Sequence, residues 1–106
     1  MTIQKSEAIE VTTFKLQGCS IDEFITANQE IDVFLKRQIG FRSRKLFEIN
    51  GLIYDLLIWD SEQNGTNAMH KLMVELSHSP VHKMINQQTV SWNITTVKHI
   101  VNSNSV

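Results

Sequence analysis

The chain has 106 residues, of which 42% are hydrophobic and 20% are charged, and its formal net charge at pH 7 is −1. This length suits one domain with a single core, and the near-neutral charge argues against a nucleic-acid-binding surface, which normally shows a basic excess. A single cysteine, Cys19, excludes an intramolecular disulfide and is expected to be an ordinary small side chain. Since no apolar run is long enough to cross a membrane and the N-terminus lacks a secretory pattern, we expect a cytoplasmic protein.

The first part of the chain predicts a strand followed by a long helix. Residues 9–17 alternate in polarity and are rich in β-branched side chains, as in a strand. Ser20 and Glu23 have the spacing of a capping box, so the helix is expected to begin at Ile21. Apolar residues then recur at helical spacing up to Gly40, which is placed to end the helix.

A β-hairpin is expected next. Strand-like segments at residues 41–49 and 52–59 flank an Asn-Gly pair, which favours a type I′ turn because both central residues of that turn have positive φ. The register of such a turn predicts that Arg42 lies opposite Trp59, in position for a cation–π contact. One face of the hairpin then carries Ser43, Lys45, Phe47, Tyr54, Leu56 and Ile58, and the other carries Arg42, Arg44, Leu46, Asp55, Leu57 and Trp59.

The rest of the chain predicts a second helix and a last strand. The apolar stripe of this helix consists of Met69, Leu72, Met73 and Leu76. The helix is expected to begin after Ser61 or Thr66 and to end before Pro80, which a short helical piece follows. Residues 89–101 have the β-branched composition of a strand. The first six or seven residues and the tail at 102–106 are expected to fray.

The predicted order β-α-β-β-α-β indicates an α+β, ferredoxin-like fold. Its four-stranded antiparallel sheet would have both helices on one face, in a single domain of residues 1–106 with an ordered core at about 8–101. The opposite sheet face is not polar, because Phe47, Tyr54 and Leu56 share it. We therefore expect a homodimer that forms through this face of the sheet.

A set of short motifs spans the predicted elements: Gly40-Phe41, Ser43-Arg44, the Asn-Gly hairpin, Asp55, Trp59-Asp60-Ser61 and Ser79-Pro80. Together they resemble the dimeric α/β-barrel superfamily, in particular its antibiotic-biosynthesis-monooxygenase-like branch, over residues 9–101. The resemblance implies a homodimer whose sheets form a barrel, with a pocket between sheet and helices in each protomer. Characterised relatives include cofactor-independent oxygenases of polyphenols and quinones, haem-degrading enzymes and stress-linked proteins of unknown activity.

Two polar residues, Asn28 and Asp32, fall on the apolar stripe of the first predicted helix, where burial requires a partner. The hairpin face with Arg44, Asp55 and Trp59 is expected to meet the helices and to supply that partner, with Arg44 diagonal to Asp55. A polar patch in an apolar pocket is typical of a small-molecule site, and a purely structural ion-pair network is the alternative. The candidate pocket residues are Asn28, Asp32, Arg44, Asp55, Trp59 and His99.

The histidines do not predict a metal site. His78 and His82 have i, i+4 spacing, but Pro80 lies between them and no third ligand is evident. These two residues and His70 are expected on the solvated surface. His99, on the last predicted strand, is kept as a candidate proton carrier.

Functions of different classes remain open. A cofactor-independent monooxygenase of an aromatic or polyketide-like substrate would use Trp59 to shape the pocket, with Asp32, Asn28 and Arg44 to orient a phenolate. The alternative is a non-enzymatic, ligand-binding or stress-associated dimeric module. Haem binding or degradation is disfavoured, because the first strand lacks the Asn of haem-degrading relatives and the residue ten positions after Trp59 is Met69, not His. No cofactor is predicted, and the sequence decides neither the ligand nor whether the protein is an enzyme.

Overall fold

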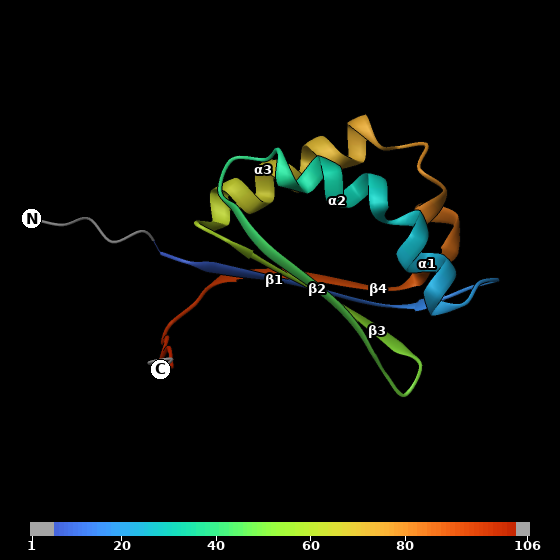
Figure 1. The fold of residues 1–106 in the computed structure, drawn as a ribbon, viewed down its shortest axis with the longest axis horizontal. Coiled ribbons are helices and arrows are strands. Elements are labelled where there is room, and N and C mark those ends of the chain that lie inside the picture. Colours follow the sequence, from blue (N-terminus) through green and yellow to red (C-terminus); the bar gives the residue numbers. More distant parts are fainter. Residues whose placement is uncertain (1–5, 104–106) are drawn as a thin grey trace, which may run out of the picture.

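The computed structural model describes residues 6–103, which form a four-stranded antiparallel sheet with all helices on one face (Figure 1). The strand order is β2-β3-β1-β4, so the predicted ferredoxin-like α+β fold is confirmed. In chain order the elements are β1 (Ala8–Leu16), α1 (Ile21–Ala27), α2 (Gln29–Lys36), β2 (Phe41–Ile49), β3 (Leu52–Trp59), α3 (Glu62–Glu75), the 3₁₀ helix η1 (Pro80–Met84) and β4 (Ile85–Thr96).

The ends of the chain were predicted to fray, and residues 1–5 and 104–106 lie outside the described residues. Within the described range, no helix has the length and apolar character needed to cross a membrane. Strand β4 begins at Ile85 and ends at Thr96, so the prediction of a last strand at 89–101 is wrong at both ends.

The first helix begins as predicted but is interrupted. Ser20 and Glu23 form the capping box, with the Glu23 amide 3.1 Å from the Ser20 hydroxyl and the Ser20 amide 2.9 Å from the Glu23 carboxylate. At Asn28 the helix breaks into α1 and α2, so the prediction of one continuous helix is wrong. The Asn28 side-chain amide donates to the Phe24 carbonyl at 2.8 Å and so interacts with the backbone of the helix itself.

The β2–β3 hairpin forms around the predicted turn. Asn50 and Gly51 have φ angles of 50° and 81°, as a type I′ turn requires. The predicted pairs next to the turn are present, with Ile49 opposite Leu52 and Phe47 opposite Tyr54. Figure 1 shows the turn end of the hairpin pointing away from the helices.

At its other end the hairpin differs from the prediction. The register shifts between Phe41 and Ser43, so that Phe41, not Arg42, lies opposite Trp59. The Phe41 and Trp59 rings meet edge to face with centroids 5.5 Å apart, and Arg42 instead pairs with Glu7 at 3.2 Å. The expected Arg42–Trp59 cation–π contact is therefore wrong, because an irregularity of this kind changes which residue faces the partner strand.

The core lies between the helices and the inner face of the sheet. Trp59 and Ile53 on β3 and Phe14 on β1 are almost fully buried there. The helices cover the hairpin face that carries Arg44, Asp55 and Trp59, as the sequence predicted. On the opposite face the side chains of β2 remain exposed, among them Phe47 at 38%.

Helix α3 packs closely against this core at Gly65. Ser61 is its N-cap, which decides between the two predicted starts, and its buried residues are Gly65 and Ala68. The predicted stripe does face the sheet, since Leu72 and Leu76 pack against the core and Met69 lines the cavity, but Met73 is 54% exposed. The absence of a side chain at Gly65 lets the helix backbone lie directly against Trp59.

Replacing Gly65 with alanine should destabilise the protein by about 1–3 kcal/mol, although alanine is the better helix former. A Cβ atom at this position would lie 2.6 Å from the Ile94 side chain and 2.9 Å from that of Trp59, so α3 must shift away from the sheet. The urea midpoint of unfolding measures the effect. His70→Ala, an exposed substitution on the same helix, is the control and should change stability by less than about 0.5 kcal/mol. Equal stability of the two variants would contradict the packing argument.

Candidate functional site

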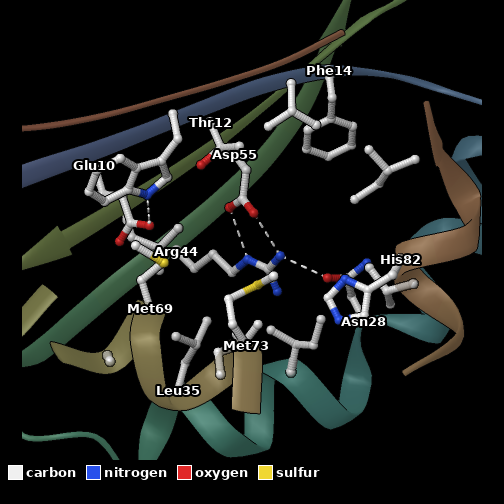
Figure 2. Close-up of a pocket in the computed structure, with 18 of the residues that line it drawn as sticks. Glu10, Thr12, Phe14, Asn28, Leu35, Arg44, Asp55, Met69, Met73 and His82 are labelled. Atoms are coloured by element: carbon white, nitrogen blue, oxygen red, sulfur yellow. Dashed lines mark hydrogen bonds and ion pairs between the residues drawn. The ribbon is translucent and has the colours of Figure 1, made fainter. Parts of the chain in front are cut away.

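A cavity of about 360 Å³ lies between the inner face of the sheet and the helices (Figure 2). Its volume falls in the range of about 300–1,000 Å³ that is common for ligand pockets. The apolar part of its wall consists of Phe14, Phe24, Ile31, Leu35, Leu57, Trp59, Ala68, Met69, Leu72, Met73, Val81, Ile85, Val90 and Trp92. The polar part consists of Glu10, Thr12, Asn28, Arg44, Asp55, His82 and Gln87. Since Met73, Gln87 and Val90 are also exposed to solvent, the cavity reaches the surface on their side.

Arg44 lies at the centre of a polar cluster in the cavity wall (Figure 2). Strand alternation places Arg44 on the inner face of β2 and Asp55 on the inner face of β3, where they form a bidentate pair at 3.0 and 2.8 Å. The guanidinium also donates to the Asp32 carboxylate and to the side-chain amide oxygen of Asn28, both at 2.8 Å. The Arg44 side chain is 9% exposed, so the cluster joins the broken helix to the hairpin beneath the surface.

The charge of Arg44 is held in place by its partners. Burial by itself lowers the pKa of the guanidinium, because the charged form loses its hydration. Hydrogen bonds and electrostatic attraction from Asp55 and Asp32 outweigh burial and raise the pKa of Arg44 above its usual value. Arg44 is therefore a permanent cation, and it is already paired before any ligand arrives.

Glu10 is a second polar group in the wall and was not among the residues that the sequence predicted there. It lies on β1 and is 7% exposed. Its two carboxylate oxygens accept hydrogen bonds from the indole nitrogens of Trp59, at 2.8 Å, and Trp92, at 2.7 Å. The strand alternation of β1 was the available signal, because it places Glu10 on the same face as the core residues Ala8 and Phe14.

Burial raises the pKa of Glu10 above its ordinary value. The hydrogen bonds from Trp92 and Trp59 lower the pKa of this carboxyl, but they do not offset the loss of hydration. A carboxylate that is fixed in position, poorly hydrated and more basic than usual has the properties of a general base. Glu10 is thus a candidate for proton removal from a bound molecule.

The histidines lie differently from the prediction. His82, expected on the solvated surface, is half-buried in η1 and lines the cavity, with its Nε2 atom 2.8 Å from the Leu76 carbonyl oxygen. If Nε2 carries the proton of this hydrogen bond, Nδ1 is left as an acceptor in the neutral ring. His99 follows the end of β4, is exposed and does not line the cavity, so its predicted place on the last strand is wrong.

The structure brings together five of the six predicted site residues. Asn28, Arg44, Asp55 and Trp59 line the cavity. Asp32 contacts Arg44, but its side chain is 49% exposed and lies outside the cavity wall. Among residues 6–103, no three His, Cys, Asp or Glu side chains are grouped so that they could hold a metal ion.

Comparisons with known proteins identify the fold. No protein-family model matches the chain, and no curated protein does either. Among solved structures, SnoaB, a cofactor-independent oxygenase from Streptomyces nogalater, aligns with a TM-score of 0.74 at 16% identity, over 92% of this chain and 99% of its own.

Two further structures show how widely this fold is used. The monooxygenase ActVA-Orf6 from Streptomyces coelicolor, solved with nanaomycin D, aligns with a TM-score of 0.65 at 15% identity, over 94% of this chain and 95% of its own. A nipsnap family protein of unknown function from Agrobacterium tumefaciens aligns with a TM-score of 0.66 at 15% identity, over 93% of this chain and 95% of its own. The chain has the ferredoxin-like fold of the antibiotic-biosynthesis-monooxygenase-like structures.

Proposed function

We propose that this protein is a cofactor-independent monooxygenase of a small aromatic substrate. The observation that carries the proposal is the apolar cavity with the Glu10 carboxylate held in its wall by two indole N–H groups. Support for the reaction class comes from two proteins of the same fold, one described as a cofactor-independent oxygenase and the other a monooxygenase solved with nanaomycin D.

An oxygenase without a cofactor has to take its electrons from the substrate. In the proposed reaction Glu10 removes a proton from an activated C–H group that is flanked by aromatic rings, which leaves a resonance-stabilised carbanion. The carbanion gives its electrons to O₂, a C–O bond forms, and protonation yields a hydroperoxide. The hydroperoxide then eliminates water, which takes the second hydrogen from the same carbon and leaves a carbonyl group. One oxygen atom of O₂ enters the product and the other leaves as water.

The other wall residues fit this reaction as binding groups. Trp59 is held by Glu10 on its indole nitrogen and by Phe41 against its ring, so its orientation is fixed. The apolar side chains contributed by β1, α1, α2 and α3 exclude water, which strengthens electrostatic interactions inside the cavity. The Arg44 cluster fixes the position of Asn28 and Asp55 without contacting the proposed base.

Oxygen consumption with a panel of anthrones tests the proposal, because an anthrone carries the required CH₂ group between two aromatic rings. With isotopically labelled O₂, one labelled atom should appear in the new carbonyl group of the anthrone product. Consumption of oxygen without label in the product would indicate an oxidase, and no turnover across the panel would contradict catalysis of this kind.

One observation favours a non-enzymatic ligand-binding module as the second candidate. Every buried side-chain nitrogen or oxygen in the described residues has a hydrogen-bond partner, so Asn28, Arg44 and Glu10 are satisfied without a ligand. Such a protein would bind the aromatic probes without consuming oxygen. A haemin titration separates the disfavoured third function, because haem binding would produce a Soret band.

We also propose that two copies of the chain associate through the outer face of the sheet. Phe47 and Tyr54 stack there with ring centroids 5.1 Å apart, and Phe47 and Ile49 remain exposed. An apolar surface of this kind on a sheet is typical of an interface. The homodimer predicted from the sequence would bury it.

Phe47→Glu should convert a dimer into a monomer, because it places a charge in the apolar interface while leaving the core of each chain unchanged. Light scattering during size-exclusion chromatography gives the mass directly. Val74→Glu is the matched control, since Val74 is 75% exposed on α3, away from the sheet. A wild-type protein with the mass of one chain would refute the homodimer.

A further inference from the structure

We infer that the cavity selects its ligand by charge: it takes an uncharged aromatic molecule that donates a hydrogen bond to Glu10, and it excludes organic anions. This inference rests on the proposed function, because it concerns the substrate of the same site. It follows from the pairing of the charged groups in the wall.

Arg44 is not available to bind an anion. Arginine normally binds carboxylates and phosphates through the paired N–H groups along the edge of its guanidinium. In this cavity that edge faces Asp55, with contacts of 3.0 and 2.8 Å. Asp32 and Asn28 accept two further hydrogen bonds, both at 2.8 Å. A ligand carboxylate would have to displace a carboxylate of the protein that is already well placed.

The charges around the cavity are unbalanced toward the negative. Asp32 and Asp55 already outnumber the single guanidinium that they share. Glu10 is a second carboxyl in the cavity wall beside Asp55, and among residues 6–103 its side-chain hydrogen-bond partners are two neutral indoles. An anion in this apolar space would lose its hydration without gaining an opposite charge, and like charges brought together cost several kcal/mol.

Glu10 can accept one more hydrogen bond. Each oxygen of a carboxylate has two acceptor positions, and the indoles of Trp59 and Trp92 use one position on each oxygen. Because Glu10 lines the cavity, a hydroxyl or amide N–H of a ligand can use a remaining position. The recognised molecule is therefore an uncharged hydrogen-bond donor with an aromatic body.

Isothermal titration calorimetry at neutral pH tests the inference with three naphthalenes that carry their substituent on the same ring carbon: naphthol, naphthamide and naphthoate. The last two are almost identical in shape and differ in charge. We expect naphthol and naphthamide to bind, and naphthoate to bind at least about tenfold more weakly than naphthamide.

Asp32→Asn tests the charge selection with a substitution that should leave the fold unchanged. Asp32 is half-exposed, and an asparagine oxygen can still accept the hydrogen bond from Arg44. The substitution removes one negative charge from the cluster, so the preference for naphthamide over naphthoate should narrow by about two- to fivefold. Glu48→Gln removes the same charge from an exposed position on β2 and should leave the preference unchanged.

Three results would overturn the inference: naphthoate binding as tightly as naphthamide, failure of all three probes to bind, or equal effects of Asp32→Asn and Glu48→Gln. The assay measures binding without oxygen, so it is independent of turnover. A protein that oxidises anthrones but does not distinguish naphthoate from naphthamide would refute the charge selection alone. A protein that selects by charge but consumes no oxygen would refute the proposed function alone.

Discussion

Glu10→Gln should lower anthrone-dependent oxygen uptake by about 10²- to 10⁴-fold, the range that general acid–base catalysis usually contributes. Glutamine keeps the length of the side chain but cannot take up a proton at neutral pH. The initial rate at saturating substrate measures the loss. In the wild type the rate should also fall on acidification through the pKa of Glu10, which burial raises above its ordinary value.

The controls for this variant address its fold. The amide nitrogen of a glutamine would face an indole N–H of Trp59 or Trp92, because both carboxylate oxygens are acceptors in the wild type. Combining Glu10→Gln with Trp92→Phe removes one of these N–H groups, and the double variant should remain as inactive as the single variant. Glu7→Gln, next to the same strand but paired with the exposed Arg42, should keep the wild-type rate. A folded Glu10→Gln protein with more than about a tenth of the wild-type rate would exclude Glu10 as the base.

Arg44→Met should lower the free energy of unfolding by about 3–5 kcal/mol, the usual loss when one partner of a buried ion pair is removed. Asp55, whose side chain is 15% exposed, would keep its charge without a cation, and the Asn28 oxygen would lose its donor. Urea denaturation measures the loss, and the slope of the free energy of unfolding against urea concentration should be unchanged.

The same strand provides a matched control. Arg42 also pairs with a carboxylate, at 3.2 Å from Glu7, but its side chain is 45% exposed. Arg42→Met should therefore change stability by at most about 1 kcal/mol, because solvent screens an exposed pair. If the two substitutions were equally destabilising, Arg44 would contribute through its packing alone and not through its buried charge.

The features that the sequence predicted are those with local causes. The Asn-Gly turn determines the register at its own end of the hairpin, and so places Arg44 and Asp55 on one face. The polar residues Asn28 and Asp32 stood out on an apolar helical stripe, and both contact Arg44, although only Asn28 is buried and Asp32 is half-exposed. Neither inference needed knowledge of distant contacts.

The missed features depend on contacts between distant segments. Glu10 looks like an ordinary polar residue of a strand until Trp59 and Trp92, 49 and 82 positions away, are known to donate to it. The shift at Arg42 follows the packing of Phe41 on Trp59, and no turn motif signals it. His82 reaches the cavity because η1 lies beside the end of α3, where the Leu76 carbonyl accepts its hydrogen bond.

The burial of Glu10 favours the protonated carboxyl, which is the form that cannot act as a base. Because its pKa is higher in the folded protein than in the unfolded chain, the fold favours the protonated carboxyl, and this contribution to stability is lost as the pH rises through the folded pKa. The ionised form that can remove a proton is thus the less stable form of the protein. An apolar residue at position 10 would not relieve this conflict, because it would leave the indole N–H groups of Trp59 and Trp92 without an acceptor and would also remove the base.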